Sequence, residues 1–410
     1  MSDKPKILMI VTLDTKPAEA QFLRRVLEEH GAEVFHLDAS IRSVSDGGAE
    51  IKPEHIAKAA GTTMEAIRAL NHEGQCQALM TEGAVECALA LDKDVHLSAI
   101  IALGGSMGTS LATTVMRRFP YGLPKVMIST MASGFTKPFV GSKDIIMVNS
   151  VCDISGLNSI TRSVYRNGAT AAVGMARDYR IAAVDTRPLV LISTLGTTEK
   201  CSATVRESLE VHGFEVMVFH TLGTGGMVLD EIARDKDVAA VVDLSLVEIN
   251  DYLNQGLCSA GPDRCKAALA KGIPTIFAPG NTDFMVAGPL DDAQARFPGK
   301  RYHVHNMALT AVRTEAPELR RLAEHMAGLI GEAKGPVAFY VPLKGFSAHD
   351  SEQGHLHEPS LPPVFASFLK ELLPKSVPVV EIPHHINDEQ FARAITMQVL
   401  AYTEANLASV

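Results

Sequence analysis

Two segments of the chain, about 180 residues apart, repeat the same sequence pattern. Residues 7–34 align with residues 189–216 without a gap, and the identical pairs include Thr12/Thr194, Leu13/Leu195, Thr15/Thr197, His30/His212 and Gly31/Gly213. Each copy has an apolar run, a threonine-rich turn and an amphipathic stretch that ends at glycine, which predicts a buried strand followed by a helix. A repeat of this size indicates that one supersecondary unit is present twice.

Two further pairs of segments follow in the same order. Residues 94–105 align with residues 237–245, and residues 122–130 align with residues 272–280. Strands that alternate with helices are typical of parallel sheets covered by helices on both faces. We therefore predict an α/β fold with two duplicated, Rossmann-like, doubly wound domains, residues 1–182 and 183–410, whose sheets are mainly parallel. Ligands of such folds bind beyond the carboxyl ends of the strands.

Local patterns predict several further elements. A polar loop is expected at Ser45–Gly47, and Asp153 and Ser155 are candidate caps of a long helix that could serve as a dimer contact or an interdomain spacer. Three short apolar runs of the first domain are predicted to be strands, namely Ala78–Met80, Ala99–Leu103 and Lys125–Ser129.

Composition excludes some classes of protein. The formal net charge is -9 and no basic block is present, which argues against a nucleic-acid-binding protein. No apolar stretch approaches the roughly 20 residues that a membrane-spanning helix needs, so no membrane association is expected. The six cysteines include no CxxC pair and no zinc-ligand spacing, which predicts reduced thiols in a cytoplasmic protein.

The sharpest local signal is a glycine-rich turn between an apolar run and a helical stretch. Small residues let a ligand approach the backbone, and the free amide groups at a helix N-terminus attract anions. A phosphate group would therefore fit this turn. Its residues are Gly104, Gly105, Ser106, Met107, Gly108 and Thr109.

The same turn fits a second interpretation. Gly104-x-Ser106-x-Gly108 matches the nucleophile elbow of serine hydrolases, with a strand before it and a helix after it. A hydrolase would also need an acid and then a histidine later in the chain, and only Asp153 with His305 or His385 could formally supply them. Neither GxxxxGK[ST] nor GxGxxG occurs, so the familiar P-loop and dinucleotide motifs are absent.

Three more groups of residues are predicted at the same edge of the first sheet. Asp14, Thr15 and Lys16 follow the first strand, and the second copy has Gly-Thr-Thr in their place. Lysine could contact a phosphate, and the aspartate could bind a ribose hydroxyl or a metal ion. The carboxyl ends of neighbouring strands share one crevice, so the segments that follow the next two strands are expected to join them: Thr81, Glu82 and Gly83, and Ser129 and Thr130.

The second domain carries a different set of polar residues. Gly225 and Gly226 open a predicted helix and suggest a second anion-binding turn. Histidine and aspartate residues gather in the later loops, where they could bind an anionic or carboxylate substrate or supply acid and base groups. Their spacing matches no zinc signature. The candidate substrate residues there are Arg301, His305, Asn306, Lys344 and His385.

Taken together, these segments resemble the UPF0261 family, whose members include the Tm-1-like ATP-binding domain proteins related to the N-terminal domain of the plant virus-resistance protein Tm-1. The matching stretches cover nearly the whole chain and include TLDTKPAE, ALGGSMGTSL, FHTLGTGGMVLDEI, SAGPDRCKAA and HINDEQFA. The resemblance implies a homodimer with ATP and Mg²⁺ bound by the first domain, at Asp14–Lys16, Thr81–Gly83 and Gly104–Thr109 with Ser129–Ser133 adjacent. The family turn is usually GGSGGTS, and Met107 replaces one of its glycines.

Three functions remain open from the sequence. The first is an ATP-dependent enzyme that transfers a phosphoryl or adenylyl group to a small acidic or carbonyl metabolite. The second is a regulatory module that binds the nucleotide without turnover. The third is a serine hydrolase that uses Ser106.

Overall fold

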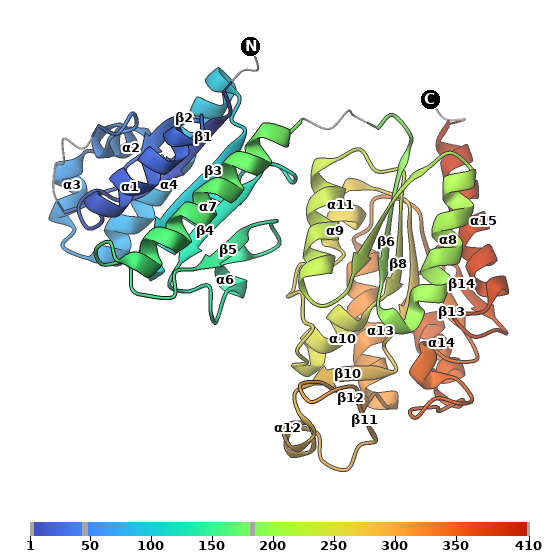
Figure 1. The fold of residues 1–410 in the computed structure, drawn as a ribbon. Helices are drawn as coiled ribbons and strands as arrows, with labels where there is room; N and C mark the ends of the chain where they lie inside the picture. The colour runs from blue at the N-terminus through green and yellow to red at the C-terminus, as the bar shows by residue number, and fades with distance from the viewer. Residues whose placement is uncertain (1–3, 43–47, 181–184, 408–410) are drawn as a thin grey trace. The chain divides into compact units, whose positions relative to one another are not determined.

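A computed structural model describes residues 4–42, 48–180 and 185–407. The chain forms two compact units, unit 1 (residues 1–183) and unit 2 (residues 184–410), as Figure 1 shows. The domain boundary expected between residues 182 and 183 and the loop expected at Ser45–Gly47 both lie outside the described residues. None of the helices in the described ranges combines the length and apolar character that crossing a membrane requires.

A parallel sheet forms the centre of unit 1. In the described residues its five strands have the order β2-β1-β3-β4-β5, and each neighbouring pair is parallel. The strand order reverses between β1 and β3, which is the arrangement of a doubly wound fold. The strands are β1 (Lys6–Ile10), β2 (Glu33–Leu37), β3 (Ala99–Gly104), β4 (Lys125–Ser129) and β5 (Ile146–Asn149).

Helices cover both faces of this sheet. Ile7 and Met9 of β1 pack with α1 (Pro17–Glu29) and α7 (Ser159–Asp178), whereas Leu8 and Ile10 pack on the opposite face. This alternation follows from the two-residue period of a strand. The opposite face is covered by α2 (Pro53–Ala59), α3 (Met64–Ala69), α4 (Glu73–Val95) and α5 (Ser106–Met116), and the short α6 (Lys137–Val140) contacts α5.

Two secondary-structure features predicted for unit 1, a strand and a helix cap, were wrong. Ala78–Met80 is not a strand but part of the helix α4. The segment around it is rich in alanine, leucine and glutamate, which favour helices, and Gly83 lets α2 approach closely because a Cβ there would lie 2.0 Å from the Ile56 carbonyl oxygen. The cap of α7 is Asn158, whose side chain accepts from the amides of residues 160 and 161, rather than Asp153 or Ser155.

Unit 2 contains a six-stranded parallel sheet within its described residues, with the order β14-β13-β9-β8-β6-β7. Its strands are β6 (Leu189–Thr194), β7 (Glu215–His220), β8 (Ala240–Ser245), β9 (Thr275–Gly280), β13 (Val337–Pro342) and β14 (Val379–Ile382). A smaller antiparallel sheet, β10-β12-β11, consists of β10 (Phe284–Ala287), β11 (Tyr302–Val304) and β12 (Thr310–Arg313).

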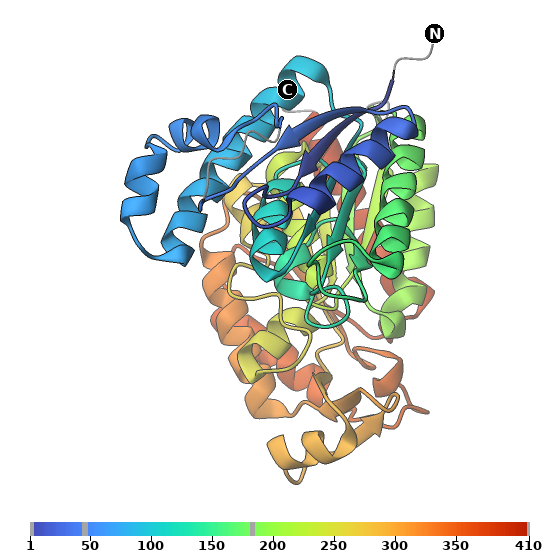
Figure 2. The same ribbon diagram turned by 60° about the vertical axis from the view of Figure 1, so that its left-hand side comes forward.

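Helices also cover both faces of the large sheet of unit 2. One face packs with α8 (Glu199–Val211) and α15 (Glu389–Leu407). The other face of the large sheet packs with α9 (Thr224–Asp235), α10 (Val247–Asn254), α11 (Lys266–Lys271), α13 (Ala316–Gly331) and α14 (Leu361–Leu372). The remaining helix of the described residues, α12 (Leu290–Arg296), lies beside the small sheet at the end of unit 2, as Figure 2 shows.

The two units share one topology. The order β2-β1-β3-β4-β5 in unit 1 corresponds to β7-β6-β8-β9-β13 in unit 2. The predicted fold of two duplicated, largely parallel, Rossmann-like sheets is therefore confirmed.

Candidate functional site

A crevice of about 770 Å³ lies at the carboxyl edge of the unit 1 sheet. One side is formed by the turn from β1 to α1 and by the turn from β3 to α5. The segment after β2, together with α3 and the start of α4, forms the other side. The order of the strands reverses between β1 and β3, so the crevice lies where doubly wound folds bind their ligands.

The N-terminus of α5 faces this crevice. Gly105 is the residue before the helix, and its carbonyl oxygen accepts the first intrahelical hydrogen bond, from the Thr109 amide at 2.8 Å. The amides of residues 106–108 precede that first bond, so the helix itself offers them no acceptor. The positive end of the helix dipole adds to their preference for an anion.

Glycines in this turn have two different roles. A Cβ at Gly104 would lie 2.9 Å from the Gly108 Cα, so the turn itself requires glycine there. A Cβ at Gly105 would meet only Thr130 Oγ1 at 4.0 Å, and one at Gly108 only the Leu103 carbonyl oxygen at 3.9 Å. Neither residue has a positive φ. The fold therefore does not require glycine at positions 105 and 108, and the missing side chains leave room beside the free amides.

Met107 does not disturb this turn. It lies in the first turn of α5, where the backbone is helical and any residue is accommodated. Its carbonyl oxygen accepts a hydrogen bond of 2.7 Å from Gln77 Nε2 of α4. Its side chain is partly exposed and lines the crevice. Methionine at this position is thus compatible with a helical first turn of α5.

Asp14, Thr15 and Lys16 line the crevice as the sequence predicted. The Asp14 carboxylate is held by the segment after β2, because its Oδ2 accepts from the amides of Ile41 and Arg42 at 3.0 Å each. Lys16 Nζ donates to the Ile154 carbonyl oxygen at 2.8 Å. Asp14 thereby orders one wall, whereas Lys16 has a neutral partner and keeps its positive charge available at the crevice.

Other predicted residues lie elsewhere. Ser129 is buried, and its hydroxyl lies 2.6 Å from Thr109 Oγ1, so it supports the first turn of α5 from behind, next to Thr130. Thr81, Glu82 and Gly83 do not end a strand at the crevice, which corrects that expectation. They lie within α4, and the first two line a separate hollow formed by α2, α4 and α5.

Sequence reasoning missed the wall opposite the glycine-rich turn. The segment after β2 supplies Arg42, α3 supplies Arg68, and the residues that follow supply Asn71, His72 and Gln77. His72 accepts the Gln75 amide and caps α4. No motif marks these residues, because they come from a loop, two helices and the connection between those helices, whose positions depend on packing against the sheet.

The described residues of unit 1 do not contain the arrangement that a serine hydrolase requires. Ser106 is exposed at the first position of α5. Within the described part of unit 1, no histidine is hydrogen-bonded to it. The predicted acid, Asp153, accepts the amide of the next residue at 2.8 Å, and the two candidate histidines belong to unit 2. The geometry therefore does not support Ser106 as an activated nucleophile.

The corresponding turn in unit 2 carries a carboxylate. The amides of Ile100 and Val241 donate to the carbonyl oxygens of Pro124 and Pro274 at equivalent places in the two sheets, and α5 and α10 each begin six residues later, at Ser106 and Val247. Glu248 is therefore the second residue of α10, the place that Met107 has in α5.

The anion-binding turn predicted at Gly225 and Gly226 is already filled by this carboxylate. Glu248 Oε1 accepts from the amides of Gly223 and Gly226 at 2.7 and 3.0 Å. A Cβ at Gly226 would lie 1.8 Å from Glu248 Oε2, and one at Gly225 would lie 1.8 Å from the His220 carbonyl oxygen. The expectation of a free turn that could bind a substrate was therefore wrong.

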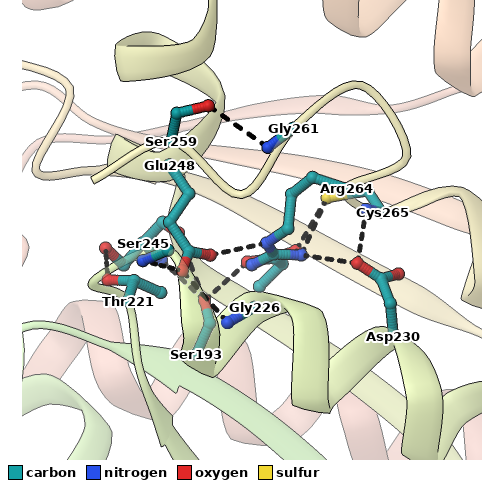
Figure 3. A network of polar contacts seen from close by, with 12 residues as sticks. Ser193, Thr221, Gly226, Asp230, Ser245, Glu248, Ser259, Gly261, Arg264 and Cys265 are labelled. Carbon is teal, nitrogen blue, oxygen red and sulfur yellow. Dashed lines mark hydrogen bonds and ion pairs between the residues drawn. The ribbon is translucent and has the colours of Figure 1, made fainter. Parts of the chain in front are cut away.

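A buried arginine completes the charge network of unit 2. Figure 3 shows Arg264 between Glu248 and Asp230, and the arginine Nε donates to Glu248 Oε2 at 2.8 Å. The two terminal nitrogens of Arg264 donate to the two oxygens of Asp243, each at 2.8 Å. Burial raises the pKa of Asp230 to about 6, although Arg264 acts in the opposite direction. In unit 2 the anion-binding turn is thus occupied by the protein's own Glu248 carboxylate, which is bound in turn by Arg264.

The remaining polar residues of unit 2 form two groups. Arg301 donates to the His357 carbonyl oxygen at 2.9 Å, and the Asn306 side chain accepts from the amides of residues 308 and 309. His305 lies in the same turn between β11 and β12. The second group lies beyond β13, where His385 Nε2 is 2.9 Å from the Ser347 carbonyl oxygen and Lys344 follows the strand.

Three imidazoles gather near the first of these groups. The ring of His303 lies 4.3 Å from that of His349 and 5.0 Å from that of His355, measured between centroids. Burial and the neighbouring histidines lower the pKa of His349 to about 4. Among the described residues, no three histidine, cysteine, aspartate or glutamate side chains are arranged to hold a metal ion.

Comparison with known proteins identifies the family. The models of the "Uncharacterised protein family (UPF0261)" N-terminal and C-terminal domains match residues 5–181 and 187–403. A UPF0261 protein of Clostridium tetani is 34% identical over 400 residues, which cover 97% of this chain and 99% of that protein. A UPF0261 protein of Mesorhizobium japonicum is 33% identical, with coverage of 95% and 97%.

A longer plant protein is also similar to this chain over part of its length. The ToMV resistance protein Tm-1(GCR237) of Solanum lycopersicum is 29% identical over 419 residues. The alignment covers 96% of this chain and 55% of the tomato protein. The family models and the bacterial relatives extend over both units. The chain therefore belongs to the UPF0261 family.

Proposed function

We propose that unit 1 binds ATP, with the phosphates at the N-terminus of α5. The observation that supports this most directly is the open space at Gly105 and Gly108. The fold could accommodate a side chain at either position, but both residues are glycine, so the space beside the backbone is left for a ligand. Three helix amides without intrahelical partners lie beside this space, and Lys16 and Arg68 add positive charge to the crevice. A volume of about 770 Å³ falls in the range of small-molecule sites.

The crevice also fits a magnesium ion that arrives with the nucleotide. Mg²⁺ commonly takes one or two protein carboxylates together with phosphate oxygens and water. Asp14 Oδ2 accepts two backbone amides, and no hydrogen bond involves its Oδ1 in the described part of the chain. Asp14 would hold the ion through this oxygen, and the bound ion would neutralise phosphate charge. Thr12 and Thr15 add hydroxyl groups beside it.

Two functions share this site and differ in turnover. An enzyme would transfer a phosphoryl or adenylyl group to a small acidic or carbonyl metabolite, whereas a regulatory module would bind ATP and leave it unchanged. Incubation of the protein with Mg·ATP and a panel of carboxylate metabolites, followed by measurement of ADP and AMP, separates the two. Homodimerisation and a cytoplasmic location remain part of the proposal and are tested by light scattering and by fractionation.

Substitution of Gly108 by glutamate is expected to weaken ATP binding at least tenfold, a loss of about 1.4 kcal/mol in binding free energy. The substitution places a carboxylate in the first turn of α5, as unit 2 has Glu248 in the first turn of α10. The new Cβ has room, so the fold should persist, while the carboxylate would occupy the α5 amides and repel phosphate. Calorimetric titration with ATP, with and without Mg²⁺, measures the effect.

Gly174→Glu provides the matched control. Gly174 lies on α7, and a Cβ there would have no neighbour within 4 Å, so the same change of charge is made away from the crevice. This variant should bind ATP like the wild type. Absence of ATP binding by the wild type would refute the proposed function, and equal losses in both variants would show that the effect is not local to the crevice.

A further inference from the structure

Unit 2 binds an anionic group of its own at the carboxyl edge of its sheet. Its Glu248 carboxylate is bound on one side by two amides at the N-terminus of α9 and on the other by Nε of Arg264. The amides belong to the connection between β7 and β8, and the arginine to the connection between β8 and β9. An anion in this position is thus bound from two sides, by a helix N-terminus and by a guanidinium.

Unit 1 has both kinds of donor but not the carboxylate. The helix N-terminus comes from α5, after β3, and an arginine comes from α3, after β2, so the two connections exchange roles. Met107 stands at the second position of α5, where α10 of unit 2 has its glutamate. The anionic group that these donors would hold therefore has to come from a ligand.

Arg68 is the arginine of unit 1 whose bonds leave it available for this role. Its Nε donates to the Ile41 carbonyl oxygen at 2.9 Å. In the described residues no carboxylate forms an ion pair with its guanidinium, although the Arg68 charge contributes to lowering the pKa of exposed Glu65 on the same helix, and its Nη2 is shielded from solvent without an acceptor. Its neighbour Arg42, in contrast, is paired with Glu73 at 2.7 Å. A charged donor left without an acceptor is costly, and an anionic ligand would remove that cost.

The backbone contact of Arg68 also prepares it for binding. Ile41, whose carbonyl oxygen holds the guanidinium, is itself held through its amide by Asp14. Both contacts fix the segment after β2 against the turn after β1, so the arginine plane is oriented before a ligand enters. A planar guanidinium that is already oriented loses less conformational entropy when it binds a phosphate.

We propose that Arg68 is the phosphate-binding arginine of unit 1 and that it holds the phosphate chain of the ligand against the α5 N-terminus. This inference rests on the proposed function and adds to it the residue that selects a phosphorylated ligand. Bound phosphate takes the place that the Glu248 carboxylate takes in unit 2. The chain therefore binds one such ligand, in unit 1, despite its duplicated fold.

Replacement of Arg68 by methionine tests this role. We expect Arg68→Met to weaken ATP binding roughly 10- to 100-fold, the range for a hydrogen bond to a charged group. The dissociation constant should also depend less steeply on salt concentration, because one screened charge contact has been removed. Arg68→Lys keeps the charge, so it should retain the salt dependence while it binds more weakly than the wild type. Calorimetry between 50 and 300 mM NaCl measures both quantities.

A control variant shows whether the effect is specific to Arg68, and the possible outcomes distinguish this inference from the proposed function. Arg25→Met removes an exposed arginine from α1 and should change neither the affinity for ATP nor its salt dependence.

Wild-type binding of ATP with unchanged affinity in Arg68→Met would overturn the inference while the proposed function stands. Weakened binding with an unchanged salt dependence would also overturn it, since it would indicate a purely structural role. Failure of the wild type to bind ATP would instead refute the proposed function. Binding of two ATP molecules per chain would contradict the single site.

Discussion

Substitution of Arg264 by methionine is expected to lower the free energy of unfolding of unit 2 by about 3–5 kcal/mol, the typical cost of removing one partner from a buried ion pair. Arg264 is 2% exposed and makes three hydrogen bonds of 2.8 Å to the carboxylates of Asp243 and Glu248. Methionine fills much of the space but leaves both carboxylates buried without their cation. Urea unfolding followed by far-UV circular dichroism measures the loss.

Two further variants test whether charge causes this loss. Arg206→Met removes an exposed arginine that pairs with Glu210 one helical turn away on α8, and such pairs contribute less than about 1 kcal/mol. The triple variant Arg264→Met/Asp243→Asn/Glu248→Gln removes the stranded carboxylates as well, so it should recover part of the stability lost in Arg264→Met. A loss in Arg264→Met no larger than in Arg206→Met would contradict the prediction.

The fold could be predicted because the repeat, and the apolar runs that form the strands, are both visible in the sequence. Residues 7–34 and 189–216 encode the same strand, turn and helix, and both copies occur at corresponding places in their sheets. Ala78–Met80 was assigned wrongly because a three-residue apolar run fits a strand or a helix equally well. Contact with α2 through Gly83, which the sequence does not reveal, accompanies the helix that forms there.

The candidate site could be predicted only in part. The turns after β1 and β3 were found because glycine and charged residues directly follow strands. Arg68 was missed because it is an ordinary helical residue, and its place beside Ile41 depends on how α3 packs. The turn at Gly225 and Gly226 misled the prediction, because the residue that fills it, Glu248, is more than 20 residues away in the sequence.

A second large effect is expected from the buried carboxyl of Asp283. It is fully buried, its Oδ2 accepts from Ser347 at 2.7 Å, and its Oδ1 has no partner among the described residues. Burial, together with the nearby Asp350 carboxylate, raises its pKa from the usual 3.8 to about 7, although Arg313 acts in the opposite direction. The folded chain therefore keeps a proton on Asp283 over a range of pH in which the unfolded chain has lost it.

The direction of the pH effect follows from this difference. Between about pH 4 and pH 7 the folded state binds more protons than the unfolded state, so the free energy of unfolding falls as the pH rises. From pH 5 to pH 8 this one group should lower it by about 3 kcal/mol. Asparagine at position 283 cannot lose a proton, so the stability of Asp283→Asn should fall less over this interval than that of the wild type.

The difference in the pH dependence of stability between the wild type and Asp283→Asn isolates the contribution of Asp283 from those of the other titrating groups. Urea unfolding at each pH gives the global stability, and hydrogen exchange measured by mass spectrometry on peptides from β10 and the segment after β13 localises the change to this part of unit 2. Asp263→Asn makes the same substitution at an exposed residue of unit 2 and should leave the wild-type pH dependence in place. Parallel curves for Asp283→Asn and the wild type between pH 5 and pH 8 would show that Asp283 is already ionised in the folded chain, and that Arg313 outweighs the effect of burial.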